Sequence, residues 1–147
     1  VLNLEGRVFM SNLDDPFRKA VQEVERLKKE TRVIIVDFHA EATSEKSALA
    51  WYLDGKVSAV LGTHTHVQTA DERVLPGGTA FMTDVGMTGP TDSVIGVRKD
   101  EAINRFLYQR PHKFEIPKGP DHLDAAVIDI DAKTGKAKSI ERIKIRS

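Results

Sequence analysis

Residues 33–62 constrain the fold of this chain more than any other segment. Residues 33–36 form a β-branched apolar run that continues through Asp37 and Phe38, and residues 57–62 form a second, largely apolar segment. The intervening residues 44–53 have the composition of a helix, which an aspartate–glycine pair then ends. A strand that is apolar throughout is typical of a parallel sheet, where both faces are covered. The segment therefore predicts a strand–helix–strand unit with two parallel, adjacent strands.

Further elements are predicted on both sides of this unit. Asp15 followed by Pro16 is a typical helix start, and apolar residues at helical spacing continue to about Glu30. Thr43 or Ser44 can cap the helix over residues 44–53. We also expect strands at 1–4, 79–83, 125–130 and 138–145, a hairpin turn around Gly135, and a helix over 99–109 with Ile103, Phe106 and Leu107 facing inward.

The order of these elements predicts an α/β fold with a mixed sheet. The first half reads β-α-β, and the last quarter reads as antiparallel strands. A length of 147 residues fits a single domain spanning residues 1–147. The chain begins at Val1, without methionine, inside what reads as a strand. We therefore expect a domain that is incomplete at its N-terminus.

Composition excludes several classes of partner and site. Lysine plus arginine and aspartate plus glutamate number 22 each, so no net basic charge supports binding to RNA or to an anionic membrane. The absence of cysteine excludes disulfides and thiolate-bound metals. No apolar run approaches the roughly 18 residues of a membrane span, and no signal-peptide pattern is present. A cytoplasmic protein is the default expectation.

Three of the five histidines follow the two strands of the central unit. His39 comes directly after residues 33–38, and His64 and His66 come after residues 57–62. The carboxyl ends of adjacent parallel strands meet at one edge of the sheet, where ligands bind. Alternate residues of an extended backbone point to the same side, so His64 and His66 are expected to share a face. The three imidazoles predict a site for one or two transition-metal ions, with hydrogen-bonded strand-end histidines as the alternative. We expect His112 and His122 to be surface or loop histidines.

Several carboxylates and a glycine accompany these histidines. Asp37 alternates with His39 along the strand, and Glu41 lies beyond the strand end. Either carboxylate can ligate a metal, but a role in capping or in orienting a histidine is favoured. Asp84 opens a glycine-rich loop, where it can orient a histidine or hold the loop. Gly86 in that loop permits close approach to a phosphate, as it would permit an ordinary tight turn.

Three segments resemble one known family. Residues 36–46 (VDFHAEATSEK), 62–72 (GTHTHVQTADE) and 83–90 (TDVGMTGP) are similar to signatures of the bacterial calcineurin-like metallophosphoesterases described as 2′,3′-cyclic-nucleotide 2′-phosphodiesterases. The likeness runs from Val1 to about Ile116. It implies a four-layer α/β/β/α sandwich with a binuclear iron or manganese centre. By this resemblance, His39 and His64 hold one metal and His66 holds the other.

The resemblance also implies an activity: hydrolysis of 2′,3′-cyclic nucleotides or other small phosphodiesters through a metal-activated hydroxide. The family's N-terminal aspartate, its bridging carboxylate and its asparagine–histidine pair have no counterpart in this chain. That histidine is the family's general acid, so we expect the general acid to lie outside residues 1–147. The chain thus resembles the carboxyl-terminal part of a family member.

Other functions remain open at this stage. Metal-dependent amidohydrolases also use two histidines separated by a single residue, but they place this motif on an early barrel strand. The antiparallel tail here argues against a barrel. Capsule-synthesis proteins, distant relatives of the metallophosphoesterases, have a similar histidine motif with different flanks. A non-catalytic regulatory or oligomerising domain that retains metal-site histidines is the third alternative. A homo-oligomer is compatible with each.

Overall fold

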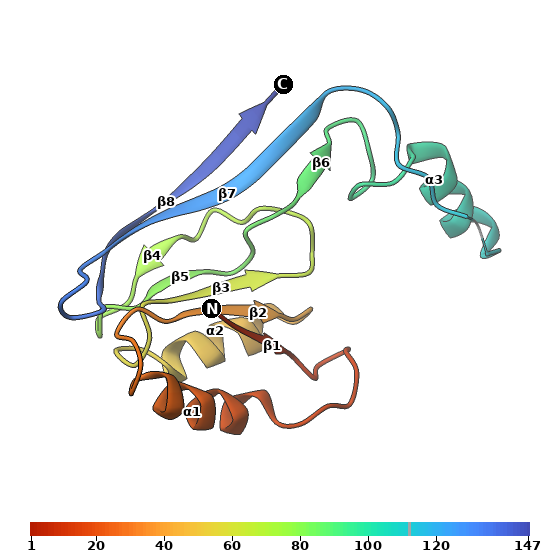
Figure 1. The fold of residues 1–147 in the computed structure, drawn as a ribbon. Coiled ribbons are helices and arrows are strands. Elements are labelled where there is room, and N and C mark those ends of the chain that lie inside the picture. The colour runs from red at the N-terminus through yellow and green to blue at the C-terminus, as the bar shows by residue number, and fades with distance from the viewer. Residues whose placement is uncertain (112) are drawn as a thin grey trace.

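The computed structural model describes residues 1–111 and 113–147, so the prediction for His112 lies outside the described residues. Figure 1 shows helices α1 and α2 on one face of a sheet, a second sheet over the other face, and α3 standing apart beyond β6. In chain order the elements are β1 (Leu2–Glu5), α1 (Pro16–Leu27), β2 (Ile35–His39), α2 (Thr43–Tyr52), β3 (Ala59–Thr63), β4 (Arg73–Val74), β5 (Ala80–Met82), β6 (Thr88–Pro90), α3 (Lys99–Tyr108), β7 (Asp121–Ile130) and β8 (Ala137–Arg146).

The first sheet confirms the predicted strand–helix–strand unit. Its strand order is β1-β2-β3-β5-β4, in which β4 alone runs antiparallel to its neighbour. Strands β2 and β3 are parallel, and His39 at the end of β2 pairs with Thr63 at the end of β3. Because these two carboxyl ends adjoin, the segments that follow them start side by side.

The two helices on this sheet begin differently. The Asp15 carboxylate accepts hydrogen bonds from the backbone N–H groups of Phe17 and Arg18, which confirms the predicted start of α1. The prediction that Thr43 or Ser44 caps α2 is wrong. The cap residue is Ala42, which offers no side-chain acceptor, and Thr43 is already helical. In the first turn of α2, the Glu45 carboxylate instead accepts bonds from the backbone of Arg7 and Val8.

The apolar core has two parts, one on each face of the first sheet. One cluster lies between this sheet and helices α1 and α2, and includes Val24, Phe38 and Leu49. The other lies between the two sheets, where Ala59, Ala80 and Ala137 are buried and larger side chains pack around them. These small residues allow the sheets to pack face to face.

The second sheet has the order β6-β7-β8 and is antiparallel. The predicted hairpin is present, with Gly135 in its turn at a φ of 76°. Strand β7 is longer than predicted, because residues 121–123 pair with β6. Strand β6 itself lies inside the segment expected to be a glycine-rich loop. Its three residues have no pattern of their own, so only the pairing partner makes them a strand.

Helix α3 occupies almost its predicted range, but the expectation that its apolar residues face inward is wrong. Ile103, Phe106 and Leu107 are 53%, 80% and 67% exposed, and Ala102 is the buried residue of this helix. The described residues thus form three of the four expected layers, helices, sheet and sheet, while α3 lies to the side (Figure 1). No helix within residues 1–111 and 113–147 is long and apolar enough to cross a membrane.

Candidate metal centre

His39 is oriented by a hydrogen-bonded chain along the carboxyl ends of β2 and β3. The Thr63 hydroxyl donates to Asp37 Oδ1 at 2.9 Å, and the same hydroxyl oxygen lies 3.1 Å from His39 Nδ1. Since the hydroxyl proton points to Asp37, the Thr63 oxygen accepts the proton of Nδ1. The lone pair of His39 is therefore on Nε2. Asn3 completes this chain of hydrogen bonds by donating to Asp37 Oδ2 at 2.9 Å.

His64 meets His39 directly. Its Nδ1 lies 3.0 Å from His39 Nε2, and the two rings meet edge to face with centroids 4.8 Å apart. The other nitrogen, Nε2, lies 3.1 Å from Glu41 Oε2. A carboxylate accepts the proton of Nε2 and leaves the lone pair on Nδ1. Two imidazole lone pairs then face one another, each fixed by an acceptor on the far side of its ring, which is the usual environment of histidines that bind metals.

The two nitrogens are close enough to contact one cation. Neutral imidazole suits iron, manganese and zinc, so the donor set fits the implied metal. Glu41 lies beside His64, and Asp37 bonds the Thr63 hydroxyl that contacts His39; their predicted role in orienting metal ligands stays a prediction. Across residues 1–111 and 113–147, however, no group of three or more histidine, aspartate or glutamate side chains is arranged to hold a metal ion.

His66 does not share a face with His64. Strand β3 ends at Thr63, and both histidines have positive φ angles, 114° for His64 and 63° for His66. Such angles are uncommon outside glycine, so the expected extended backbone is replaced by a turn. His66 Nδ1 donates to the backbone carbonyl of Ile95 at 2.9 Å. The structure thus brings His39 and His64 together and directs His66 toward the segment that precedes α3.

Asp84 holds this turn through its carboxylate. Its Oδ2 accepts a hydrogen bond from the backbone N–H of Thr65 at 3.0 Å and forms an ion pair with Lys46 Nζ at 2.8 Å. Its Oδ1 accepts from the N–H of Gly86 at 2.9 Å. Burial raises the pKa of the Asp84 carboxyl, but the bonds from Lys46, Gly86 and Thr65 outweigh burial and hold that pKa below its usual value. Of the two roles predicted for Asp84, the structure shows that it holds the loop.

Two residues that shape this region, Lys46 and Gln68, have no role that the sequence predicts. Lys46 is the last residue of the segment 36–46, and nothing in its local sequence marks it as buried. Gln68 places its amide nitrogen 3.1–3.3 Å from three backbone carbonyls, those of Val85, Ala125 and Ile143. It thereby ties the histidine loop to the second sheet.

Gly86 is accounted for by its backbone. Its φ is 89°, and an added Cβ would overlap the carboxylate of Asp124. A tight turn against Asp124 thus explains this glycine without a ligand. Its predicted role in phosphate binding stays a prediction.

A cavity of 440 Å³ opens beside His66. Its polar wall includes His122, Asp124 and Lys144. Lys144 Nζ lies 2.8 Å from Asp124 Oδ1, and His122 Nε2 lies 3.5 Å from Asp124 Oδ2. The prediction that His122 is a surface or loop residue is wrong: it lies in β7, and its side chain is only 10% exposed. Its ring lies beside Asp124 and within 3.5 Å of the Thr91 hydroxyl, contacts that no local pattern showed.

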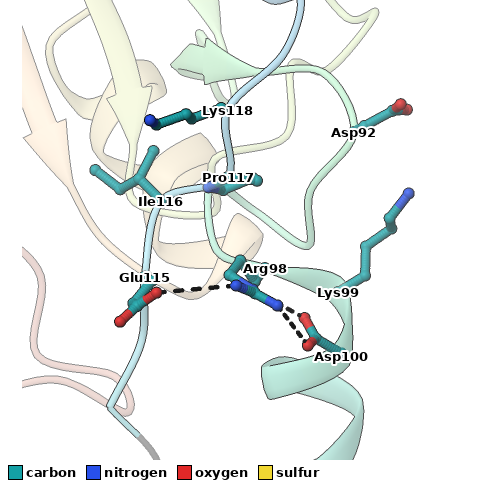
Figure 2. A pocket seen from close by; sticks show the side chains of 8 residues that line it. All are labelled: Asp92, Arg98, Lys99, Asp100, Glu115, Ile116, Pro117 and Lys118. Carbon is teal, nitrogen blue, oxygen red and sulfur yellow. Dashed lines mark hydrogen bonds and ion pairs between the residues drawn. The ribbon is translucent and has the colours of Figure 1, made fainter.

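A second cavity, of 630 Å³, surrounds the start of α3 and shares no lining residue with the first. Figure 2 shows Arg98 in its wall, joined to Asp100 and Glu115. The guanidinium, the group best suited to a phosphate, is therefore occupied by carboxylates. Among the described residues that line it, this cavity therefore offers no unpaired guanidinium for a phosphate group.

Comparison with known proteins adds family relationships to this geometry. A family model described as YmdB-like protein matches residues 1–143. A 2′,3′-cyclic-nucleotide 2′-phosphodiesterase of Bacillus subtilis is 56% identical over 145 residues, which cover 99% of this chain and 55% of that protein. A crystal structure of a novel phosphatase from Mycoplasma pneumoniae matches with a TM-score of 0.89 and 39% identity, covering 98% of this chain and 52% of that chain.

A crystal structure of a hypothetical protein from Thermus thermophilus matches with a TM-score of 0.91 and 44% identity. The match covers 98% of this chain and 56% of that one. The chain therefore spans about half the length of the relatives it matches.

Proposed function

Because this chain belongs to the YmdB-like family, we propose that the whole protein is a metal-dependent phosphodiesterase acting on 2′,3′-cyclic nucleotides or other small phosphodiesters. The name of the Bacillus subtilis relative supports the reaction and the substrate class. One structural observation carries the metal dependence. His39 Nε2 and His64 Nδ1 face each other at 3.0 Å, and each ring is oriented by an acceptor behind it.

Two iron or manganese ions are the proposed cofactors. His39 and His64 would hold one ion, and His66 would contribute to the other. Since His66 Nδ1 donates to Ile95, its Nε2 also keeps a free lone pair. Bound metal ions would polarise the phosphodiester and activate the attacking water. The contribution of this chain is to present three imidazoles, each with one ring nitrogen that can bind a metal.

The cavity beside His66 is the proposed place for the substrate. A volume of 440 Å³ lies within the range of small-molecule sites. Its wall combines His122 and the Asp124–Lys144 ion pair with apolar surface from Met87 and Ile95. This mixture of polar and apolar surface suits a ligand with a polar phosphodiester end and an uncharged base or alcohol. The general acid is assigned to the part of the protein outside residues 1–147.

Activity of a ligand variant tests the proposal. The whole protein loaded with manganese is expected to hydrolyse bis-p-nitrophenyl phosphate and 2′,3′-cyclic nucleotides. Loss of a metal ligand in His64→Ala is expected to lower kcat/KM by roughly 100-fold or more. Lys133→Ala, in the exposed turn between β7 and β8, is the control and should match the parent protein. Unchanged turnover by His64→Ala would refute the assignment.

A further inference from the structure

Lys46 and Asp84 form an ion pair in the interior of the protein. Their charged atoms lie 2.8 Å apart, and both side chains are 0% exposed. Removing two charges from water is costly, and apolar residues of similar size often serve stability as well or better. Stability alone therefore gives a weak reason for this pair. Neither side chain contacts a histidine through the bonds described above, so a direct part in metal binding does not explain it either.

The contacts of Asp84 show what the pair joins. Lys46 comes from α2, Thr65 from the turn after β3, and Asp84 from the segment after β5. The backbone of Asp84 adds two bonds to Thr69: its carbonyl accepts from the Thr69 N–H at 3.0 Å, and its N–H donates to the Thr69 hydroxyl at 3.0 Å. Asp84 thus holds both ends of the histidine turn, Thr65 through its carboxylate and Thr69 through its backbone.

The backbone that Asp84 holds is strained. Thr65 lies between His64, with a φ of 114°, and His66, with a φ of 63°. Non-glycine residues in such regions persist only where surrounding contacts impose them. The bond from the Thr65 N–H to Asp84 is charge-assisted and acts at the centre of this turn.

Gly62 provides the space that the pair needs. A Cβ at this position would overlap the Thr83 carbonyl and would lie 2.9 Å from Lys46 Cδ. The aliphatic part of Lys46 therefore passes the end of β3 only because residue 62 has no side chain. The ion pair and the strained turn are parts of one local arrangement.

From these contacts we propose that Lys46 and Asp84 are positioning residues that hold the Thr65 backbone, and so present His64 and His66 in the orientation that metal binding and turnover require. This inference rests on the proposed metallophosphodiesterase function. The pair acts through Thr65 and touches neither the metal ligands nor the reacting atoms.

Two double variants of the whole protein separate this role from loss of charge. Lys46→Met/Asp84→Asn removes both charges and keeps an oxygen that can accept from Thr65. Lys46→Met/Asp84→Leu also removes both charges but offers no acceptor. Compared with the asparagine variant, the leucine variant is expected to bind Mn²⁺ at least roughly tenfold more weakly. Its kcat is also expected to be at least roughly tenfold lower, whereas its KM should not change. Equal Mn²⁺ dissociation constants and kcat values, within about twofold, would overturn the proposal.

Two further readouts keep the test decisive. Mn²⁺ affinity is measured by calorimetry, so the positioning role is tested even if the parent protein hydrolyses no phosphodiester, an outcome that would refute the proposed function alone. If the leucine variant does not fold, amide hydrogen exchange of the parent protein tests whether Asp84 holds the Thr65 amide. The Thr65 amide is expected to be protected by about 100-fold or more against exchange. Free exchange at Thr65 would overturn the proposal.

Discussion

Each of the three histidines has one ring nitrogen bound to an acceptor that comes from elsewhere in the chain. The acceptor is a hydroxyl for His39, a carboxylate for His64 and a backbone carbonyl for His66. These bonds decide which nitrogen carries the proton, and the remaining nitrogen is then the one that can bind a metal. At the scale of single residues, the chemistry of the site is therefore set by the groups behind the rings.

Thr63→Val tests whether the hydroxyl behind the His39 ring determines metal binding by His39. Valine has a similar volume, but it cannot accept the Nδ1 proton or donate to Asp37. Mn²⁺ affinity and kcat of the whole protein are expected to fall roughly 10–100-fold, measured by calorimetry and steady-state kinetics. Thr63→Ser keeps the hydroxyl and should remain close to the parent protein. A valine variant with parent-like affinity would contradict the role of Thr63.

Asp71 predicts a pH dependence of stability. Burial raises the pKa of its carboxyl, but hydrogen bonds from the side chains of Thr69 and Thr83 and from the Thr83 backbone outweigh burial and lower that pKa. A lowered pKa in the folded state stabilises the protein above the unfolded-state pKa of about 3.9, and this stabilisation is lost as the pH falls through the folded value.

Asp71→Asn is therefore expected to lower the free energy of unfolding at about pH 7, and the difference from the parent protein should shrink near about pH 3. Urea denaturation at both pH values measures this difference in the free energy of unfolding. A difference that stays constant, or grows, on acidification would show that the Asp71 charge does not stabilise the fold.

At the scale of elements, the site depends on how closely β3 approaches the end of β5. Gly62 lies one residue before the end of β3, and its N-terminal neighbours pair with β5 in parallel register. The Gly62 carbonyl accepts a bond from the Val85 N–H at 2.9 Å, which continues this pairing beyond the strands. Any side chain at residue 62 would separate the two segments that carry the histidine turn and Asp84.

Gly62→Ala is expected to destabilise the protein by about 3 kcal/mol or more, because the added methyl overlaps the Thr83 carbonyl. Equilibrium unfolding measures the change. Gly89→Ala, where the nearest heavy atom to an added Cβ is Met87 Cε at 3.6 Å, is the matched control and should change stability by less than about 0.5 kcal/mol. Equal stabilities for the two variants would be inconsistent with the close approach.

Helix α3 carries exposed apolar side chains, including Phe106 and Leu107. Exposed apolar patches of this kind are typical of interaction surfaces.

At the scale of the whole molecule, the described residues leave one face of the second sheet uncovered. Leu123, Val127 and Ile145 on β7 and β8 are 41%, 54% and 57% exposed. This is the surface on which the fourth layer of an α/β/β/α sandwich would pack. The imidazole pair is complete in this chain, but no third side chain of a metal site joins it within residues 1–111 and 113–147.

The isolated 147-residue chain is therefore expected to bind metal more weakly than the whole protein. Two imidazoles without a carboxylate ligand give an incomplete site. Elemental analysis after dialysis should show less than one ion per chain, with circular dichroism confirming that the chain is folded. A stoichiometric two-metal complex of the isolated chain would contradict this expectation.

Local pattern was sufficient for much of the architecture. The apolar runs predicted β2 and β3 as parallel neighbours, Asp15 and Pro16 marked the start of α1, and Gly135 marked the hairpin turn. The family also followed from contiguous signatures. These features depend on the spacing of side chains within one segment, and such spacing is legible in a sequence.

Tertiary structure alone decided the rest. Strand β6 exists because β7 pairs with it, and the His122 ring lies within 3.5 Å of the hydroxyl of Thr91, 31 residues away. The alternation of His64 and His66 suggested one face, but the turn anchored on Asp84 separates them. Lys46 is buried because Asp84, 38 residues away, neutralises it. In each case the deciding partner lies far along the chain, and its contact outweighs the local preference of the residue concerned.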